Sequence, residues 1–502
     1  MAMRRKVVIV GAGPAGCAAA LAAAELGLEV TLVDEHPQAP AAMSLDAPYF
    51  YGARLPAVLS NEAEIADRVL GANEALMECL EAGVDVIVGT SVWGVFQPGP
   101  NSRHLSGSEI GLADRERSWM LPFNHLVVAA GARDLVLSFP GWELPGVIGV
   151  MGASALLSRY AALGGRRILV LGTGNAALAF ARDARAADLE IAGLVGPAAA
   201  IEGDAELARA LADDGVPFLL GKTIERALGD GTVNGARLLG FDGAVIAGSG
   251  TDIPCDTICL AFGTVPNLEL PAVAGCEIVF DPARGGWAPR LDETMETSLS
   301  GIFVVGDAAG VDEASRLAPA RAVAQARQAV AEIARRAGLA DAPAAVAMPT
   351  RAAAYAPELW LESLIASGGD EVVVCQCETV TRRELVAVSA PRYLGAPDAA
   401  PPGAVGMLTV GGRPSQDSLK RLTRAGMGHC QGKRCRDHAA MLLARAAGVA
   451  VGDVVPGSYR VPVRPIPLNV MAPDDESAET RATWPVWLHP VAEDGCDSGG
   501  GH

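Results

Sequence analysis

The sequence has few aromatic residues, few charges and fewer basic than acidic residues. Aromatic residues make up only 5% and charged residues 20% of its 502 positions, while hydrophobic residues make up 50%. A composition so rich in apolar residues excludes a disordered chain, and the length suits roughly three domains. The 40 Lys and Arg against 58 Asp and Glu give a formal net charge of −18. Such acidity argues against a nucleic-acid partner and against an anionic membrane face.

The chain has one long uncharged run, at residues 7–24, and we do not interpret it as a signal peptide or membrane span. Gly11, Gly13, Pro14 and Gly16 interrupt this run where a signal peptide needs a continuous helix. We therefore expect no integral membrane segment and a cytoplasmic location. The ten cysteines do not indicate a disulfide framework, because a long cytoplasmic chain keeps its thiols reduced.

Residues 6–33, which include this run, have the order strand, glycine-rich turn, helix and strand that is typical of a dinucleotide-binding unit. Strands are predicted at residues 6–10 and 30–33, with an alanine-rich helix at 18–26 between them. The turn has the pattern GxGxxG, whose glycines allow a tight bend, a close diphosphate and close helix packing. The phosphates then meet the N-terminus of the helix. The predicted cradle consists of Gly11, Gly13, Pro14, Ala15 and Gly16.

Further residues indicate which nucleotide this cradle takes. Asp34 ends the second strand, where an acid binds the adenosine ribose hydroxyls, and Glu35 can share that role. The run GIFVVGDAAG places Gly306 and Asp307 directly after a predicted strand, and AAGARD contains Gly131. These runs resemble the second fingerprint and the crossing segment of FAD enzymes with the glutathione-reductase fold. That resemblance implies FAD, with Asp307 at the flavin ribitol.

One departure from that pattern leaves an alternative open. In many relatives a Gly-Gly pair follows the ribose acid and lines the flavin, but residues 36–52 contain no such pair. An adenine nucleotide without a working flavin therefore remains an alternative at this site.

A second cradle, GxGxxA, follows the predicted strand at residues 168–171 and consists of Gly172, Gly174 and Ala177. The next strand ends in Val195-Gly196-Pro197, which offers neither an acid for a ribose hydroxyl nor an arginine for a 2′-phosphate. We therefore predict a degenerate NAD-type domain without bound NAD(P). A redox-active cysteine pair is not expected either, because Cys255 and Cys259 lie on an apolar strand pattern that is typical of core residues.

Four cysteines cluster late in the sequence, as C-x-C-E and C-x₄-C. Thiolates hold [2Fe–2S] clusters as sets of four, whereas zinc sites usually show C-x₂-C pairs. Three glycines between residues 426 and 432 expose backbone N–H groups, and Lys433 and Arg434 add positive charge. We predict a [2Fe–2S] cluster over zinc or free thiols, with the ligands Cys375, Cys377, Cys430 and Cys435. Histidines expected at the surface are His36, His104, His125, His489 and His502.

In combination, these motifs and the segment at residues 423–435 resemble the flavoprotein α subunits of multi-subunit amine and amino-acid dehydrogenases. This group includes subunits of opine oxidases and hydrogen cyanide synthase; the cysteine segment also resembles bacterioferritin-associated-ferredoxin-like domains. The resemblance implies an amino-acid-oxidase-like flavoprotein β subunit that oxidises a C–N bond. It further implies a small third subunit, a downstream electron acceptor and an FMN at a subunit interface. No residue of this chain is predicted to be catalytic.

The predicted fold is α/β, a glutathione-reductase-like flavoprotein with two dinucleotide-binding domains and a small helical [2Fe–2S] domain. Two alternatives to the electron-relay function remain, a self-contained NAD(P)H-dependent FAD/[2Fe–2S] reductase and a nucleotide-holding scaffold subunit. The predicted boundaries are 1–140 with 255–338 for the FAD domain, 141–254 for the NAD-type domain, 339–370 for a linker, 371–450 for the [2Fe–2S] domain and 451–502 for an extension.

Overall fold

The computed structural model describes the chain in several ranges. These are residues 6–37, 67, 69–99, 105, 107–311, 317, 319–339, 357–388 and 409–471. Most of the stretch at 36–52, the Pro/Ala-rich part of the predicted linker and the polar end of the predicted extension lie outside them.

The first domain is built on a parallel five-stranded sheet with the order β20-β7-β1-β2-β3. Its strands, in that order, are Ile302–Val304, His125–Val128, Lys6–Val10, Glu29–Val33 and Asp85–Ile87. Successive side chains of β1 enter opposite cores, as strand geometry requires. Val7 and Ile9 pack with helices on one face, and Val8 and Val10 pack with an antiparallel sheet on the other. The helices are α1 (Pro14–Glu25), α4 (Glu74–Glu81) and α9 (Ala320–Ala337), and the antiparallel sheet is β4 (Ser91–Phe96), β5 (Glu109–Ala113) and β6 (Ser118–Pro122).

The first turn and strand agree with the prediction, but the helix begins four residues earlier than expected. Helix α1 starts at Pro14, with Gly13 as its N-cap. Proline is favoured at the first helical position because a backbone N–H at that position has no partner within the helix, so its absence in proline costs nothing. The cradle glycines therefore lead directly into the helix.

The second domain repeats this architecture with the sheet order β12-β11-β10-β16-β9. Its strands, in that order, are Phe218–Leu220, Glu190–Gly196, Arg167–Leu171, Thr257–Leu260 and Val147–Gly149; its helices include α6 (Asn175–Ala186) and α7 (Ala205–Asp213). Because β16 pairs with both β10 and β9, the predicted boundary at 254/255 falls one strand too early. An antiparallel sheet of β13 (Lys222–Leu228), β14 (Gly235–Gly240) and β15 (Thr251–Pro254) completes the domain.

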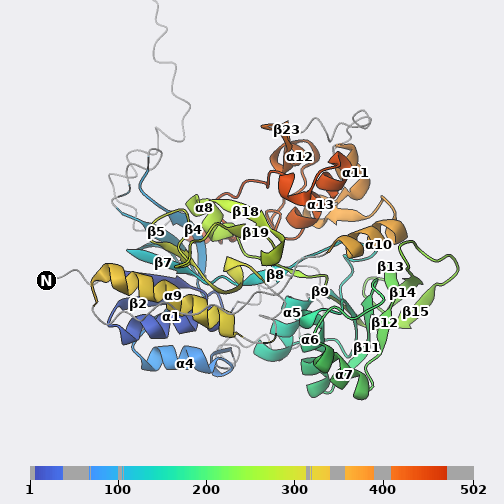
Figure 1. The fold of residues 1–502 in the computed structure, drawn as a ribbon, viewed down its shortest axis with the longest axis horizontal. Helices are drawn as coiled ribbons and strands as arrows, with labels where there is room; N and C mark the ends of the chain where they lie inside the picture. Colours follow the sequence, from blue (N-terminus) through green and yellow to red (C-terminus); the bar gives the residue numbers. More distant parts are fainter. Residues whose placement is uncertain are drawn as a thin grey trace, which may run out of the picture.

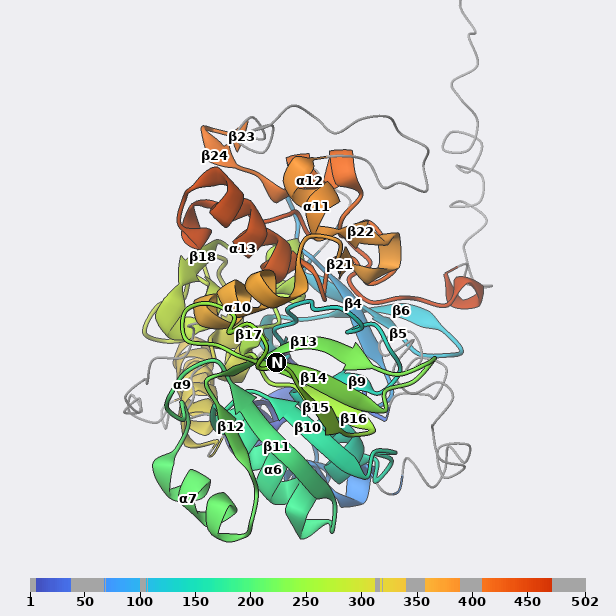
Figure 2. The same cartoon turned by 90° about the vertical axis from the view of Figure 1, so that its right-hand side faces the viewer.

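The cysteine-containing part forms a module of short strands and helices beside the second domain (Figure 1). Its elements are α10 (Glu358–Gly368), β21 (Val373–Cys375), β22 (Val380–Thr381), α11 (Arg382–Ala387), β23 (Thr409–Val410), β24 (Arg413–Pro414), α12 (Gln416–Thr423) and α13 (Arg436–Ala447). Helix α10 lies within the predicted linker, so the linker prediction is wrong for residues 358–368. Trp360 and Leu364 of this helix are buried, and one apolar core runs from the second domain into the module. Figure 2 shows α10 between the β13 sheet and α13.

The segment after α13 returns to the first domain as a strap, which we define as residues 454–471. Val463 donates its N–H to the carbonyl of Trp93 at 2.8 Å and is buried with the β4-β5-β6 sheet. Asn469 reaches the carbonyl of Arg115. The strap therefore joins the end of the described chain to its beginning. Among the described helices, none has both the length and the apolar character that crossing a membrane requires.

Candidate functional site

The first cradle has the geometry that a diphosphate requires. A Cβ on Gly11 (φ +105°) would lie 2.4 Å from the carbonyl oxygen of Ala129, and one on Gly16 would lie 1.7 Å from that of Gly11. A Cβ on Gly13 would meet no atom within 4 Å. Gly11 and Gly16 are thus required by packing, whereas Gly13 leaves space above the helix N-terminus where a phosphate can approach.

The three predicted nucleotide motifs converge at one sheet edge. Strands β20, β7 and β1 are neighbours and parallel, so the segments after their carboxyl ends lie together. Gly306 lies against the start of α1, because a Cβ there would be 2.9 Å from the Cβ of Ala15. Its N–H donates to Gln325 Oε1 at 2.8 Å. Asp307 follows in a short 3₁₀ turn (Gly306–Ala309). Gly131 (φ +69°) accepts from Asn267 N–H at 3.1 Å and faces open space.

The two predicted ribose acids have different surroundings. Asp34 accepts from the backbone N–H of Ala12 at 2.6 Å and from that of His36 at 2.7 Å, so its carboxylate closes the cradle turn. Glu35 forms an ion pair with Arg464 of the strap. No motif in the sequence indicated Arg464, because it lies 429 residues from its partner.

The second cradle is covered by its own chain. The N–H of Gly203 donates to the carbonyl of Thr173 at 2.9 Å, and that of Asp204 donates to Asn175 Oδ1 at 2.7 Å. The Thr173 hydroxyl bonds to the Glu202 carboxylate at 3.4 Å, and burial raises the pKa of Glu202. A carboxylate beside the GxGxxA turn would repel a diphosphate there. Besides the missing ribose acid, the structure therefore gives a steric and an electrostatic reason against dinucleotide binding at the second cradle.

The four clustered cysteines come together in two pairs. Cys377 lies beside Cys430, and Cys375 lies beside Cys435. The neighbouring Cys377 thiol lowers the pKa of Cys430 to about 5, and the neighbouring Cys435 thiol lowers the pKa of Cys375. Cys375 and Cys435 are buried, whereas Cys377 and Cys430 are partly exposed. We call Cys375 and Cys435 the inner pair and Cys377 and Cys430 the outer pair.

The loop glycines are required by this arrangement. A Cβ on Gly428 would lie 2.3 Å from the Cβ of Cys377. Gly426 (φ +81°) donates its N–H to the Cys375 sulfur at 3.3 Å. Glu378, which follows the C-x-C pair, forms an ion pair of 2.7 Å with Arg424. The two cysteine segments are thus held face to face.

Within the described ranges, no group of three or more His, Cys, Asp or Glu side chains is arranged to hold a metal ion. A binuclear cluster has a different requirement, because four cysteines serve its two irons. The inner and outer pairs, with a backbone N–H already directed at one sulfur, fit that requirement.

Arg133 connects the nucleotide edge to the cysteine loop. It lies on β8 (Ala132–Asp134), which pairs with β17 (Thr264–Pro266). Its guanidinium donates to the carbonyl of Lys433 and to Asp437 Oδ2, both at 3.0 Å, and lies 3.4 Å from Glu269. The neighbouring carboxylates raise its pKa, although burial opposes this. No local motif marks the contact with the cysteine loop, because Lys433 and Asp437 lie 300 and 304 residues from Arg133 in sequence.

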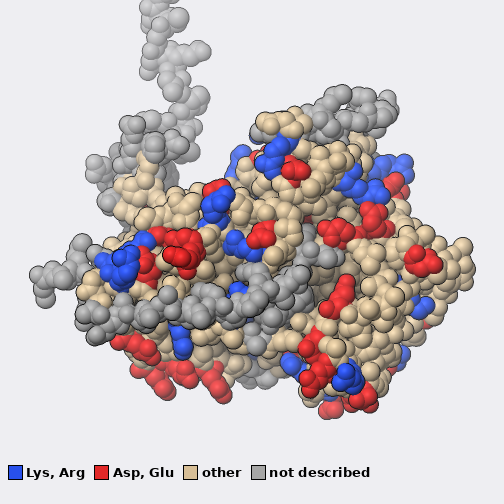
Figure 3. All heavy atoms as spheres, in the orientation of Figure 1, with Lys and Arg blue, Asp and Glu red and all other residues tan. Residues whose placement is uncertain are grey.

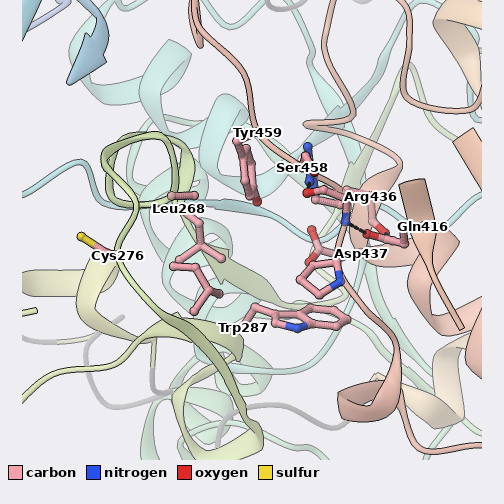
Figure 4. Close-up of a pocket in the computed structure, with 12 residues that line it drawn as sticks. Leu268, Cys276, Trp287, Gln416, Arg436, Asp437, Ser458 and Tyr459 are labelled. Carbon is pink, nitrogen blue, oxygen red and sulfur yellow. Dashed lines mark hydrogen bonds between the residues drawn. The ribbon is translucent and has the colours of Figure 1, made fainter. Parts of the chain in front are cut away.

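A pocket of about 340 Å³ lies where the first domain meets the module (Figure 4). Leu268 and Trp287 line it from the first domain, and Arg436, Asp437 and Tyr459 line it from the module and strap. The Arg436 guanidinium lies 3.7 Å from the centre of the Tyr459 ring. Asp437 is also the Arg133 partner, so this pocket adjoins the connection between the two sites.

Other predicted residues have structural surroundings. Cys255 and Cys259 are buried free thiols, as expected for core residues, and burial raises the pKa of both. The surface prediction is wrong for His125, which is only 7% exposed in β7. It is also wrong for His36, which is partly buried and bonds to the Tyr160 hydroxyl at 2.6 Å. His104, His489 and His502 lie outside the described residues.

Two family models and several known proteins are similar to this chain. Residues 5–333 match the family model "pyridine nucleotide-disulphide oxidoreductase", and residues 409–475 match "sarcosine oxidase A3 domain". The A subunit of opine oxidase from Rhizobium meliloti (strain 1021) is 27% identical, over 93% of this chain and 98% of the relative. The hydrogen cyanide synthase subunit HcnB of Pseudomonas aeruginosa is 25% identical, over 93% and 98%.

A third relative and a solved structure extend the comparison. The α subunit of sarcosine oxidase from Corynebacterium sp. (strain U-96) is 23% identical, over 93% of this chain and 45% of the relative. The crystal structure of L-proline dehydrogenase from P. horikoshii superposes with a TM-score of 0.59 at 19% identity, over 93% of this chain and 80% of that one. This likeness confirms the predicted fold of two dinucleotide-binding domains.

Proposed function

Because this chain belongs to the pyridine nucleotide-disulphide oxidoreductase family, we propose that it is the electron-relay subunit of a heteromeric dehydrogenase. Family membership and similarity to oxidase subunits make it a flavin-dependent oxidoreductase. The relatives named opine oxidase, hydrogen cyanide synthase and sarcosine oxidase subunits favour an amine, amino acid or opine as the substrate of the complex. The observation that carries the relay proposal is the connection of a nucleotide edge to two cysteine pairs through Arg133.

In this proposal FAD lies at the first cradle. Gly13 provides the space for the diphosphate, and the segments of Gly131 and Asp307 lie at the same sheet edge. Asp34 and Glu35 lie where the adenosine ribose is expected. An adenine nucleotide without a flavin remains the alternative, because the stretch that would line the flavin lies outside the described residues.

The four cysteines, Cys375 and Cys435 of the inner pair and Cys377 and Cys430 of the outer pair, would hold a [2Fe–2S] cluster. Flavin, when bound, takes an electron pair and releases single electrons, which a one-electron cluster needs. This chain's own residues orient the two sites: Arg133 holds the carbonyl of Lys433, two residues before the inner ligand Cys435. The loop backbone directs an N–H group at the Cys375 sulfur.

We infer that the C–N bond is oxidised in a separate flavoprotein β subunit of amino-acid-oxidase type. The names of the relatives as subunits support this division. A small third subunit, an interface FMN and a downstream acceptor belong to the same proposal. A cytoplasmic location remains a prediction.

The self-contained NAD(P)H reductase has less support, because the Glu202 segment covers the second cradle. Anaerobic addition of NADH tests it directly. A relay subunit keeps its flavin oxidised, and rapid flavin bleaching by NADH would establish the reductase instead.

The first experiment is an absorption spectrum of anaerobically purified protein, with nucleotide extraction and iron and sulfide assays. Flavin bands with about two iron and two sulfide per chain are expected. Colourless protein that releases only an adenine nucleotide would contradict the relay function and leave a scaffold subunit.

A further inference from the structure

The positive charge of this acidic protein is concentrated around the cysteine loop. Residues 409–436 contain seven basic residues and a single acidic one, whereas the whole chain has a net charge of −18. Acidic side chains gather elsewhere, for example over α4 at the lower edge in Figure 3. The basic residues are Arg413, Lys420, Arg421, Arg424, Lys433, Arg434 and Arg436; the acid is Asp417.

Several of these cations bind uncharged oxygens, so their charge is retained. Arg413 donates to the carbonyls of Asp453 and Gly452, and Arg436 donates to that of Gly457. Arg434 donates to the amide oxygen of Gln376 at 2.8 Å. A hydrogen bond to a carbonyl leaves the net charge of a guanidinium unchanged, whereas the charge of Arg424 is balanced by its ion pair with Glu378. With Arg424 set aside, residues 409–436 still carry six basic residues against one acid, so this part of the module keeps a positive field.

Two exposed apolar side chains lie in the same segment, one near the end of α12 and one in the loop before Cys430. Leu422 is 50% and Met427 42% exposed, at the end of α12 and in the cysteine loop. Arg421 is exposed beside Leu422, and His429 Nε2 lies 3.7 Å from the sulfur of Cys377. We define the collar as Arg421, Leu422, Arg424, Met427 and His429.

We propose that the collar is the docking surface for an acidic, one-electron carrier protein. The inference rests on the proposed function. It adds the surface from which electrons leave this subunit and the kind of protein that accepts them. The outer pair is the more exposed one, so a carrier would approach a bound cluster from that side. Each encounter would transfer one electron: the cluster would be oxidised by one unit and the carrier reduced by one, without a proton.

Two observations favour an acidic carrier over other occupants. The basic charge of this face attracts acidic partners, and the negative charge of the rest of the protein repels them from other faces. Two exposed apolar side chains suit a small, transient contact, as found for redox encounters, rather than a permanent interface. A membrane or nucleic acid would meet the acidic remainder of the molecule.

The test uses the full chain, purified with its cluster and reduced with dithionite. After removal of excess dithionite, stopped-flow mixing measures the second-order rate of electron transfer to cytochrome b5, which is acidic, and to cytochrome c, which is basic. We expect Arg421→Glu to slow cytochrome b5 reduction about tenfold at low salt, and about 0.5 M salt to remove the difference. The affinity of the oxidised protein for cytochrome b5, measured by calorimetry, should fall in parallel.

Arg209→Glu is the matched control, because Arg209 is an exposed arginine on α7, far from the cysteines in sequence. Met427→Ser tests the apolar part and should weaken cytochrome b5 binding at every salt concentration. Equal rates of cytochrome b5 reduction for wild type and Arg421→Glu at low salt, or the same slowing by Arg421→Glu with cytochrome c, would overturn the docking proposal. Protein without a cluster would overturn the proposed function instead, so the two failures are distinguishable.

Discussion

Gly13 is the cradle position where a side chain can be added without disturbing the fold. Its φ of −76° suits any residue, and a Cβ there meets no protein atom within 4 Å. We expect Gly13→Ala to keep the melting temperature and to lose at least about tenfold in affinity for FAD or an adenine nucleotide, since the methyl group occupies the diphosphate position. Calorimetric titration of the apoprotein and circular dichroism measure the two effects.

Two other glycines supply the controls for Gly13. Gly71→Ala adds a methyl group in open space at a helix end and should change neither quantity. Gly16→Ala would put the Cβ 1.7 Å from a backbone oxygen and should prevent folding. If Gly13→Ala binds nucleotide as well as Gly71→Ala, the phosphates do not lie at this turn.

His438 predicts a pH dependence at the level of a single residue. It is 1% exposed, and burial, followed by the charge of Arg382, lowers its pKa to about 3. The unfolded chain therefore binds a proton that the folded chain does not, below the ordinary histidine pKa of about 6.5. Stability is complete above that pH and falls with further acidification, by about 2 kcal/mol between roughly pH 7 and pH 5 from this residue.

His438→Leu should remove this contribution. Urea unfolding at about pH 7 and about pH 5 compares the variant with the wild type. The variant should lose less stability on acidification, and an unchanged pH dependence would mean that the imidazole is accessible to protons in the folded state.

At the scale of elements, Arg133 joins β8 to the cysteine loop. Arg133→Leu leaves Glu269 and Asp437 buried without their cation, which costs about 3–5 kcal/mol. We expect lower thermal stability of the proposed cluster, followed by its visible absorption, and an altered electron paramagnetic resonance signal. Arg133→Lys should recover part of the stability, because it restores the charge but not the fork of donors.

Arg237→Leu is the control for Arg133, because Arg237 also meets two acids but is 42% exposed. Exposed ion pairs contribute at most about 1 kcal/mol, so this variant should behave almost like the wild type. Similar losses in both variants would show that Arg133 has no special part in holding the loop.

The elements that the sequence predicted well are those that local patterns determine. The strand at Lys6–Val10, the cradle glycines and the cysteine spacing follow from short-range rules, and the structure brings these segments together. Helix α10 was missed because its buried side chains belong to a core supplied by β13 and the second domain. Arg133 and Arg464 were missed because their partners are far away in sequence and no local pattern marks them.

At the scale of the molecule, the second domain and the module share one core. Trp360 is 2% exposed and packs edge-on to Phe262, with 4.8 Å between ring centres. Trp360→Ala should cost about 3–5 kcal/mol. Because the core is continuous, loss of cluster absorption and loss of helical circular dichroism should occur at the same, lower temperature. Leu359→Ala, on the exposed face of α10, should leave both unchanged, and separate transitions in Trp360→Ala would show two independent cores.

The ion pair between Glu35 and Arg464 has a consequence for biosynthesis. A ribosome makes Glu35 429 residues before Arg464. The ribose side of the nucleotide site, together with the strap that crosses the β4-β5-β6 sheet, is therefore completed only when nearly all of the described chain has left the exit tunnel. Nucleotide loading should accordingly be a late, post-translational step, and nascent chains that end before the strap should retain nucleotide poorly.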